Sequence, residues 1–316
     1  MSRIYEALQK AESERRLERR EPEPRTPEEP FNSAIYATAV ATAEEEQASS
    51  TLVAEPYVEP SVVRVDPNAL DVSKISVRPW ALSLEHLPSL LERGPAVEQF
   101  RSLRSRIFEL RDIAPLKSIM VTSGLPQEGK SFISTNLAMS LARHKNSKVL
   151  LIDGDMRRYT IHQLLGCESH PGLADYLAGK ASLVEVMQRS ETFEGMTAGT
   201  AAVANNLTFI AGGNGGDKAA DLSGSPRFGE LIRLAAPHFD WIIIDSSPVL
   251  PVSDAVNLAR ACDGVLLVAR SGQTKFPVAQ RAQSELKASN ILGFVLNAVQ
   301  EAPQVGSYYG YDAAKP

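Results

Sequence analysis

The sequence predicts an α/β fold: a mostly parallel sheet with helices on both faces. Six short apolar runs rich in Val, Ile and Leu alternate with helical stretches between residues 90 and 300. Near-continuous apolar strands are typical of parallel sheets that are buried on both faces. Of the 316 residues, 43% are hydrophobic, which is enough for a sizeable core. The six runs are 118–123, 148–153, 207–212, 241–246, 263–270 and 291–297.

Helices are expected between most of these runs. The clearest covers 96–111, where Val97, Phe100, Leu103 and Ile107 fall on one apolar stripe at helical spacing. A second helix, over 131–143, follows the first strand after a short loop, and a helix is the usual connection between parallel strands. The further helical stretches are 171–178, 226–236, 253–260 and 277–289.

Composition excludes several classes of protein. The net charge is −5, which argues against a general nucleic-acid binder. Two cysteines are too few for a disulfide framework. No apolar run approaches the roughly 18–20 residues that cross a bilayer, and the acidic and basic front end is unlike a secretory signal. Secreted, integral-membrane and disulfide-rich classes are therefore not expected.

The front quarter of the chain differs in composition from the rest. Residues 1–80 contain no glycine, hold 8 of the 20 prolines, and carry the whole excess of negative charge. We predict a short N-terminal helix over 1–20, which is either solvated or docks on a partner. A disordered, acidic, Pro-rich linker is expected over 21–89, because such a segment buries little surface. The P-loop domain then covers 90–300, and a flexible tyrosine-containing tail covers 301–316.

The strongest motif is the stretch from Gly124 to Ser131, which fits G-x-x-x-x-G-K-[ST] between a predicted strand and a predicted helix. Glycines let the backbone wrap closely, so that its N–H groups point at phosphate oxygens. Lys130 supplies a full charge, and Ser131 can ligate Mg²⁺. The fold is therefore predicted to be that of a P-loop NTPase. The expected nucleotide-binding residues are Gly124, Leu125, Pro126, Gln127, Glu128, Gly129, Lys130, Ser131, Phe132, Arg157 and Asn297.

Acidic residues end two of the predicted strands. Asp153 and Asp155 follow one strand, and Asp245 ends another. Ligand groups gather at the carboxyl ends of parallel strands, and neighbouring carboxylates favour a shared cation such as Mg²⁺. We predict that Ser131, Asp153 and Asp245 hold the metal. Asp254 is interpreted as a helix-start residue rather than a ligand.

Asn297 ends the last predicted strand. Its amide can donate and accept, as adenine recognition requires. A turn residue at a strand end is an equally good interpretation, so the two remain open.

Together these residues resemble the bacterial tyrosine kinases (BY-kinases) of capsule and exopolysaccharide assembly, which are related to the ParA/MinD/Mrp ATPases. The segment 149–166 is similar to the family's second Walker-A-type motif, and 242–255 to its Walker B region. Glu98, Arg101 and Arg104 match its E-x-x-R-x-x-R element. The segment 307–312 is similar to its C-terminal tyrosine cluster.

The resemblance implies an ATP- and Mg²⁺-dependent tyrosine autokinase that phosphorylates its C-terminal tail in trans and regulates polysaccharide polymerisation and export. The implied partners are other copies of the chain, a separate membrane polysaccharide co-polymerase and a tyrosine phosphatase. The implied location is the cytoplasm, at the inner face of the membrane through that partner. The implied roles are phosphoacceptors for Tyr308, Tyr309 and Tyr311, an oligomer interface for Glu98, Arg101 and Arg104, and catalysis for Lys130, Asp153 and Asp155.

Rival interpretations concern both the reaction and single segments. A ParA/MinD-type ATPase without kinase activity usually has a lysine where this chain has Leu125. A protein that senses ATP without turnover is the other rival. The row of Glu98, Arg101 and Arg104 is alternatively a solvated charged face, and the tail is alternatively a sticky disordered end.

Overall fold

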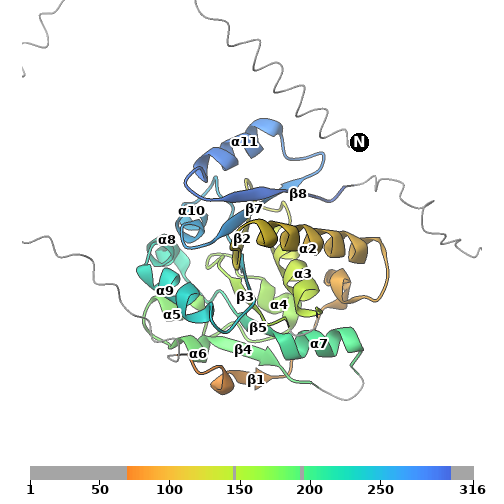
Figure 1. Cartoon of the computed structure of the whole chain (residues 1–316). Coiled ribbons are helices and arrows are strands. Elements are labelled where there is room, and N and C mark those ends of the chain that lie inside the picture. The colour runs from red at the N-terminus through yellow and green to blue at the C-terminus, as the bar shows by residue number, and fades with distance from the viewer. Residues whose placement is uncertain (1–69, 145–146, 193–195, 300–316) are drawn as a thin grey trace, which may run out of the picture. The chain divides into compact units, whose positions relative to one another are not determined.

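A single eight-stranded sheet organises the part of the chain that the computed structural model describes, residues 70–144, 147–192 and 196–299. Its strands run in the order β1-β4-β5-β3-β6-β2-β7-β8, and every neighbouring pair is parallel except β4 and β5 (Figure 1). The strands are β1 (Ser76–Arg78), β2 (Ser118–Ser123), β3 (Val149–Asp153), β4 (Met187–Ser190), β5 (Leu207–Ile210), β6 (Trp241–Asp245), β7 (Gly264–Arg270) and β8 (Ile291–Asn297).

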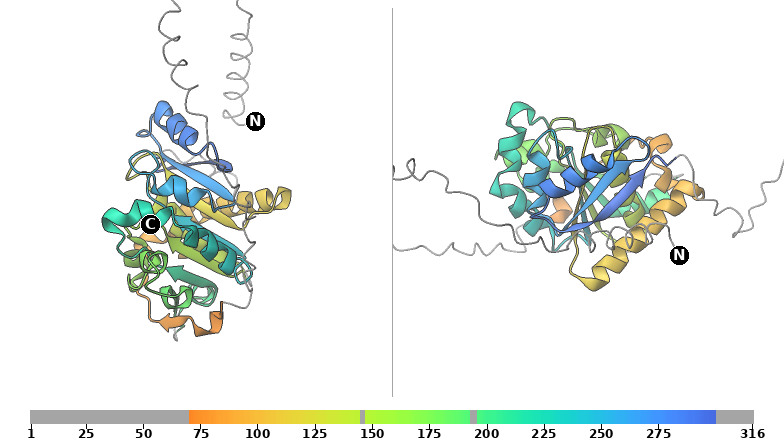
Figure 2. Two further views of the ribbon diagram at one scale, coloured as in Figure 1. Left: turned by 90° about the vertical axis from the view of Figure 1, so that its left-hand side faces the viewer. Right: turned by 90° about the horizontal axis from the view of Figure 1, so that it is seen from above.

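Helices cover both faces of the sheet, on opposite sides in Figure 2. One layer contains α2 (Pro95–Ile113), α3 (Lys130–Ala142), α4 (Ile161–Leu165) and α7 (Ala198–Asn206). The other contains α5 (Leu173–Leu177), α6 (Leu183–Val186), α8 (Ala219–Ser223), α9 (Pro226–Ala235), α10 (Asp254–Ala259) and α11 (Phe276–Glu285). Short 3₁₀ turns are η1 (Val72–Lys74), η2 (Leu84–His86), η3 (Pro88–Leu90) and η4 (Gly216–Lys218).

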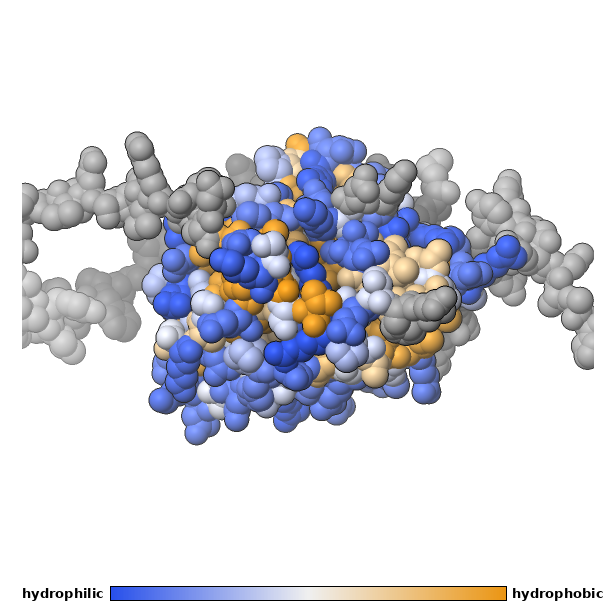
Figure 3. Space-filling view, turned by 90° about the horizontal axis from the view of Figure 1, so that it is seen from below, coloured by the Kyte–Doolittle hydropathy of each residue, from blue (hydrophilic) through white to orange (hydrophobic). Residues whose placement is uncertain are grey.

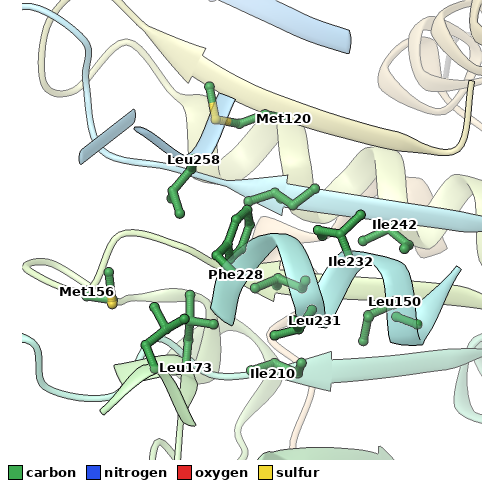
Figure 4. Packing of buried hydrophobic residues seen from close by; sticks show 14 of the residues in the cluster. Met120, Leu150, Met156, Leu173, Ile210, Phe228, Leu231, Ile232, Ile242 and Leu258 are labelled. Atoms are coloured by element: carbon green, nitrogen blue, oxygen red, sulfur yellow. The ribbon is translucent and has the colours of Figure 1, made fainter. Parts of the chain in front are cut away.

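Alternation along the strands divides the core into two clusters. Successive strand residues point to opposite faces, so Ile242 and Ile244 of β6 pack under α9, whereas Ile243 packs under α3. Phe228 and Ile232 of α9 lie against the first of these clusters (Figure 4). Because both faces are covered, all residues of β2, β3 and β6 are buried.

The six strands predicted from apolar runs are all present, and the α/β fold is confirmed. Two strands are additional. β4 reads Met-Gln-Arg-Ser, and it pairs antiparallel with β5 at one side of the sheet. β1 is a three-residue edge strand beside β4. Neither has an apolar run, because the only apolar residue of β4 is Met187 and the only one of β1 is Val77.

The folded region begins at least 20 residues before the boundary that the sequence predicts at residue 90. Residues 70–89, expected to be linker, contain η1, β1, η2 and part of η3. Trp80 and Leu87 of this segment are 7% and 0% exposed, and Leu87 lies in the cluster under α2 and α3. Three-residue elements are too short for a periodic pattern, so this segment resembles linker in composition. Residues 1–69 and 301–316, with the predicted N-terminal helix and tail, lie outside the described residues.

The β1 side of the molecule has a mixed surface. Hydrophilic residues surround smaller hydrophobic areas in the view of Figure 3. Val77 of β1 is one apolar residue that stays 54% exposed. No helix within 70–144, 147–192 and 196–299 is both long enough and apolar enough to cross a lipid bilayer.

A paired substitution tests whether the segment before residue 90 belongs to the core. Leu87→Ala is expected to lower the free energy of unfolding by about 2–5 kcal/mol, because it empties a buried site. Leu84→Ala, in the same segment but 51% exposed, is expected to change it by less than about 0.5 kcal/mol. Urea unfolding of the two variants measures both. Equal effects would contradict the placement of Leu87 in the core.

Candidate active site

The P-loop connects the end of β2 to the start of α3. Gly129 caps the helix with φ of 95°, and Gln127 also has a positive φ of 65°. The Leu125 N–H donates to the Glu128 carboxylate over 2.8 Å, which closes the loop on itself. The first N–H groups of α3 have no carbonyl partner within the helix and form the positive end of its dipole. The loop and this helix end therefore make an anion-binding cradle.

Three acidic residues surround Lys130 at the same edge of the sheet. Asp153 and Asp245 are register partners at the ends of β3 and β6, and Asp155 follows two residues later. Their side chains are almost fully buried, at 0%, 1% and 3% exposed respectively. The Lys130 Nζ lies 3.0 Å from Asp155 Oδ2 and 3.9 Å from Asp245 Oδ2. The structure thus brings together all three predicted catalytic residues.

Burial and charge act against each other in this cluster. Burial lowers the pKa of Lys130, but Asp245 and Asp155 outweigh it, so that this pKa is raised overall. Burial also raises the pKa of Asp153 well above its usual value, and the charge of Asp245 raises it further. Burial raises the pKa of Asp245 against the opposing charge of Lys130. Three carboxylates share one ammonium here, so further positive charge is favoured at this site.

The side chains of Ser131 and Asp245 fit a magnesium ion. The Ser131 hydroxyl donates to Asp245 Oδ2 over 2.6 Å. Asp245 Oδ1 is buried and has no hydrogen-bond partner among the described residues. Hydroxyl and carboxylate oxygens are the hard ligands that Mg²⁺ prefers, and a phosphate-bound Mg²⁺ needs only one or two carboxylates. Accordingly, the described residues contain no cage of three or more His, Cys, Asp or Glu.

Asp153, the third predicted metal ligand, is held by the backbone. Its Oδ1 accepts the N–H of Asp155, and its Oδ2 accepts the N–H of Ile161, each over 3.2 Å. These bonds fix its side chain beside Asp245 at the end of the neighbouring strand.

Two predicted nucleotide-binding side chains have other partners. The Phe132 ring packs against Phe100 of α2, with ring centroids 5.8 Å apart, so its side chain belongs to the core under α2. Only its backbone remains for phosphate. The Arg157 Nε donates to Asp254 Oδ2 over 2.7 Å. Asp254 is the first residue of α10, as predicted, and is 1% exposed.

Asn297 contacts the P-loop directly. Its Nδ2 donates to the Glu128 carbonyl over 3.0 Å. A Cβ on Gly129 would lie 2.0 Å from the same nitrogen, so the loop and the end of β8 are in close contact. The amide is a brace for the loop, a role that neither sequence interpretation contained.

Two further residues of the β7 end hold the loop, and sequence reasoning did not single them out. Arg270 donates to the Gln127 carbonyl over 3.0 Å, and the Thr274 hydroxyl donates to the Glu128 carboxylate. Arg270 is the last residue of β7. Asp153 and Asp245 were identified as polar residues at the carboxyl ends of apolar strands. The same rule applies to Arg270.

The predicted interface row on α2 is only partly solvated. Arg101 pairs with Glu98 over 2.5 Å on the helix surface. Arg104 instead donates to the Ser140 carbonyl of α3 over 2.7 Å. The three predicted phosphoacceptor tyrosines lie outside the described residues.

Comparison with known proteins places this geometry in a family. Tyrosine-protein kinase YwqD of Bacillus subtilis (strain 168) is 33% identical over 220 residues, which are 69% of this chain and 86% of that protein. This chain belongs to the bacterial tyrosine kinases. The resemblance inferred from the sequence is therefore confirmed, and BY-kinases are P-loop enzymes that use ATP. No family model matched the chain.

Other BY-kinases are longer. Tyrosine-protein kinase wzc of Salmonella typhimurium is 33% identical over 219 residues, 68% of this chain but 28% of that protein. The chain thus spans a little over a quarter of such relatives. The solved kinase domain of the Escherichia coli tyrosine kinase ETK superposes with a TM-score of 0.61 and 28% identity, covering 75% of this chain and 93% of that domain. It confirms the P-loop NTPase fold.

Gly129→Ala tests the contact between the P-loop and β8. An alanine here has a strained positive φ and collides with Asn297, so nucleotide affinity is expected to fall about tenfold or more. Gly229→Ala in α9, where a Cβ meets nothing within 4 Å, is the control. It is expected to retain affinity and to gain about 0.5–1 kcal/mol of stability. Calorimetric titration with nucleotide would contradict the role of the contact if both variants bound equally.

Asp245→Asn tests whether the buried charge of Asp245 lowers the stability of the metal-free protein. The raised pKa of Asp245 means that the metal-free folded state holds this proton more tightly than the unfolded state, whose pKa is near 3.8. Stability from this group is present below that unfolded pKa and lost as pH rises towards the folded pKa. The melting temperature of the variant minus that of the wild type is therefore expected to increase with pH above about 4.

Melting curves in a chelating buffer, from pH 4 to pH 8, measure this difference. Asp112→Asn, at an exposed position of α2, is the matched control and is expected to show no trend. A flat difference for Asp245→Asn would refute the account. Added magnesium nucleotide is expected to stabilise the wild type more than this variant.

Proposed function

We propose that the chain is an ATP- and Mg²⁺-dependent autokinase that transfers phosphate to its own C-terminal tyrosines in trans. The observation that carries this proposal is the placement of the Lys130 ammonium, 3.0 Å from Asp155 and at the start of the helix that follows the P-loop. Membership of the BY-kinases supplies the reaction class.

The expected contributions to binding follow from the site. Backbone N–H groups of the loop and the start of α3 hold the β- and γ-phosphates, and Lys130 neutralises their charge. Ser131 and Asp245 would hold Mg²⁺, with Asp153 beside Asp245 at the end of the neighbouring strand. When bound, the metal supplies charge neutralisation on the transferred group. Most of the rate enhancement then comes from positioning and electrostatics rather than covalent chemistry.

In the transfer step, the tyrosine oxygen forms a bond to the γ-phosphorus as the bond from that phosphorus to the β,γ-bridging oxygen breaks. Phosphotyrosine and ADP are the products. The phenol proton passes to Asp153 or Asp155, because a tyrosine hydroxyl with a pKa near 10 benefits from a base. The raised pKa of Asp153 supports it as the acceptor.

The acceptors we propose are Tyr308, Tyr309 and Tyr311. The three tyrosines fall within four residues, beside Gly306 and around Gly310. Tyrosines of a folded core are not expected to be this crowded, so we interpret them as phosphoacceptors. Glu98, Arg101 and Arg104 are proposed to contact a neighbouring copy, which brings a second tail to the site. The partly buried position of Arg104 against α3 supports a role beyond solubility.

The cellular role is proposed from the family. The kinase acts at the inner face of the membrane with a separate polysaccharide co-polymerase, and a tyrosine phosphatase reverses the modification. Cycles of phosphorylation and dissociation then regulate polymer length or export. Support for this role comes from the resemblance described above.

Mass spectrometry of the purified full-length chain tests the reaction. Lys130→Met is expected to abolish phosphotyrosine, because the charge that binds the phosphates is lost. Lys148→Met is the control, since Lys148 is exposed just before β3, at the strand end opposite to the site. The combined Tyr308→Phe, Tyr309→Phe and Tyr311→Phe variant is expected to lose most of the phosphate signal, whereas Tyr159→Phe keeps it.

Three results would contradict the proposal. Phosphate release from ATP without phosphotyrosine would indicate a ParA/MinD-type ATPase. An undiminished phosphotyrosine signal in the triple Phe variant would show that other tyrosines are the acceptors. Nucleotide binding without any turnover would indicate an ATP sensor.

A further inference from the structure

Three arginines meet in a cavity that is separate from the P-loop. Arg101 and Arg104 come from α2, and Arg143 is the C-cap of α3. The two helices lie in the same layer (Figure 1). The cavity has a volume of about 220 Å³ and is lined by Ser89, Val97, Arg101, Arg104, Ser140 and Arg143.

The positive charge of this cavity is only partly neutralised. Arg101 pairs with Glu98. Arg104 donates to the Ser140 carbonyl, and Arg143 donates to the carbonyls of Ser89 and Leu91. These carbonyls are neutral acceptors, and no ion pair of Arg104 or Arg143 with a carboxylate occurs within the described residues.

Neighbouring positive charge destabilises the protonated guanidinium groups of Arg104 and Arg143. Burial lowers the pKa of Arg104, and the charges of Arg101 and Arg143 lower it further. Burial likewise lowers the pKa of Arg143, with a further contribution from Arg101 and a smaller opposing effect of the Glu92 carboxylate. An anion placed among them would relieve this repulsion.

We propose that this cavity is a second anion site, which binds a doubly charged oxyanion of the phosphate class. Guanidinium groups recognise phosphate through paired, charge-assisted N–H···O bonds. The volume equals that of roughly seven water molecules, enough for one phosphoryl group with a partial hydration shell. Ser89 and Ser140, 2% and 3% exposed, add polar groups to the wall.

The site is distinct from the nucleotide site. Helix α3 begins at Lys130 in the P-loop and ends next to Arg143, 13 residues later. At 1.5 Å per residue, the two ends are about 20 Å apart. The proposal therefore does not depend on kinase activity, and its failure would leave the proposed function untouched.

Two sources offer this chemistry: free inorganic phosphate and a phosphoryl group on tyrosine. Titration calorimetry on the full-length chain distinguishes them, with inorganic phosphate, O-phosphotyrosine and unmodified tyrosine as probes. The protein is first saturated with MgADP, so that the P-loop is occupied. Low ionic strength without sulfate keeps the electrostatic attraction measurable.

Two variants locate the binding. Arg143→Ala is expected to weaken phosphate binding about tenfold or more, since it removes a charged hydrogen-bond donor. Arg101→Gln leaves the bonds of Arg104 and Arg143 to the backbone in place. It is also expected to weaken phosphate binding, because it removes one of the three positive charges. Arg106→Ala is the control, because Arg106 is on α2 but pairs with Glu109 away from the cavity. Melting temperatures confirm that each variant folds.

Binding of phosphate or of O-phosphotyrosine that both variants weaken and Arg106→Ala does not would support the site. The tighter of the two ligands identifies the source. No heat with either, or equal affinity in Arg143→Ala, Arg101→Gln and the wild type, would overturn the proposal. Equal binding of unmodified tyrosine would overturn it as well.

Discussion

The structure depends on the burial of Asp153, Asp155 and Asp245 around Lys130. Buried carboxylates are costly unless they are paired or hydrogen-bonded. The register of β3 and β6 nevertheless places Asp153 and Asp245 side by side, and the P-loop brings one ammonium to them. The backbone N–H groups that hold Asp153 reduce the cost. The remaining excess of negative charge favours further positive charge at this site.

Much of this arrangement could be predicted because it rests on local patterns. Apolar runs predicted the six central strands, and the carboxyl-end rule brought Asp153, Asp155 and Asp245 to one edge. The sequence did not predict β1, β4 and the segment around Trp80 and Leu87, because elements of three or four residues need few apolar residues. The contacts of Asn297 and Arg270 with the P-loop were not predicted, for another reason. Their partners are loop carbonyls that are 140 to 170 residues away in sequence, and no local pattern reports such contacts.

Helix α3 links the two charged regions of the molecule. Its positive N-terminal end meets the P-loop, whereas its C-terminal end, where the dipole is negative, is followed by Arg143. The arginine satisfies that end of the helix and at the same time holds the carbonyls of Ser89 and Leu91. The same side chain therefore ties the segment before α2 to the helix that starts at the nucleotide site.

The end of β8 also determines where the rest of the chain starts. Because Asn297 touches the P-loop, every residue added after it departs from the wall of the nucleotide site. Tyr308 is 11 residues further on, which is at most about 40 Å of extended chain. For the transfer in trans that we propose, this span sets the greatest distance from Asn297 at which the Tyr308 phenol could meet the site of another copy.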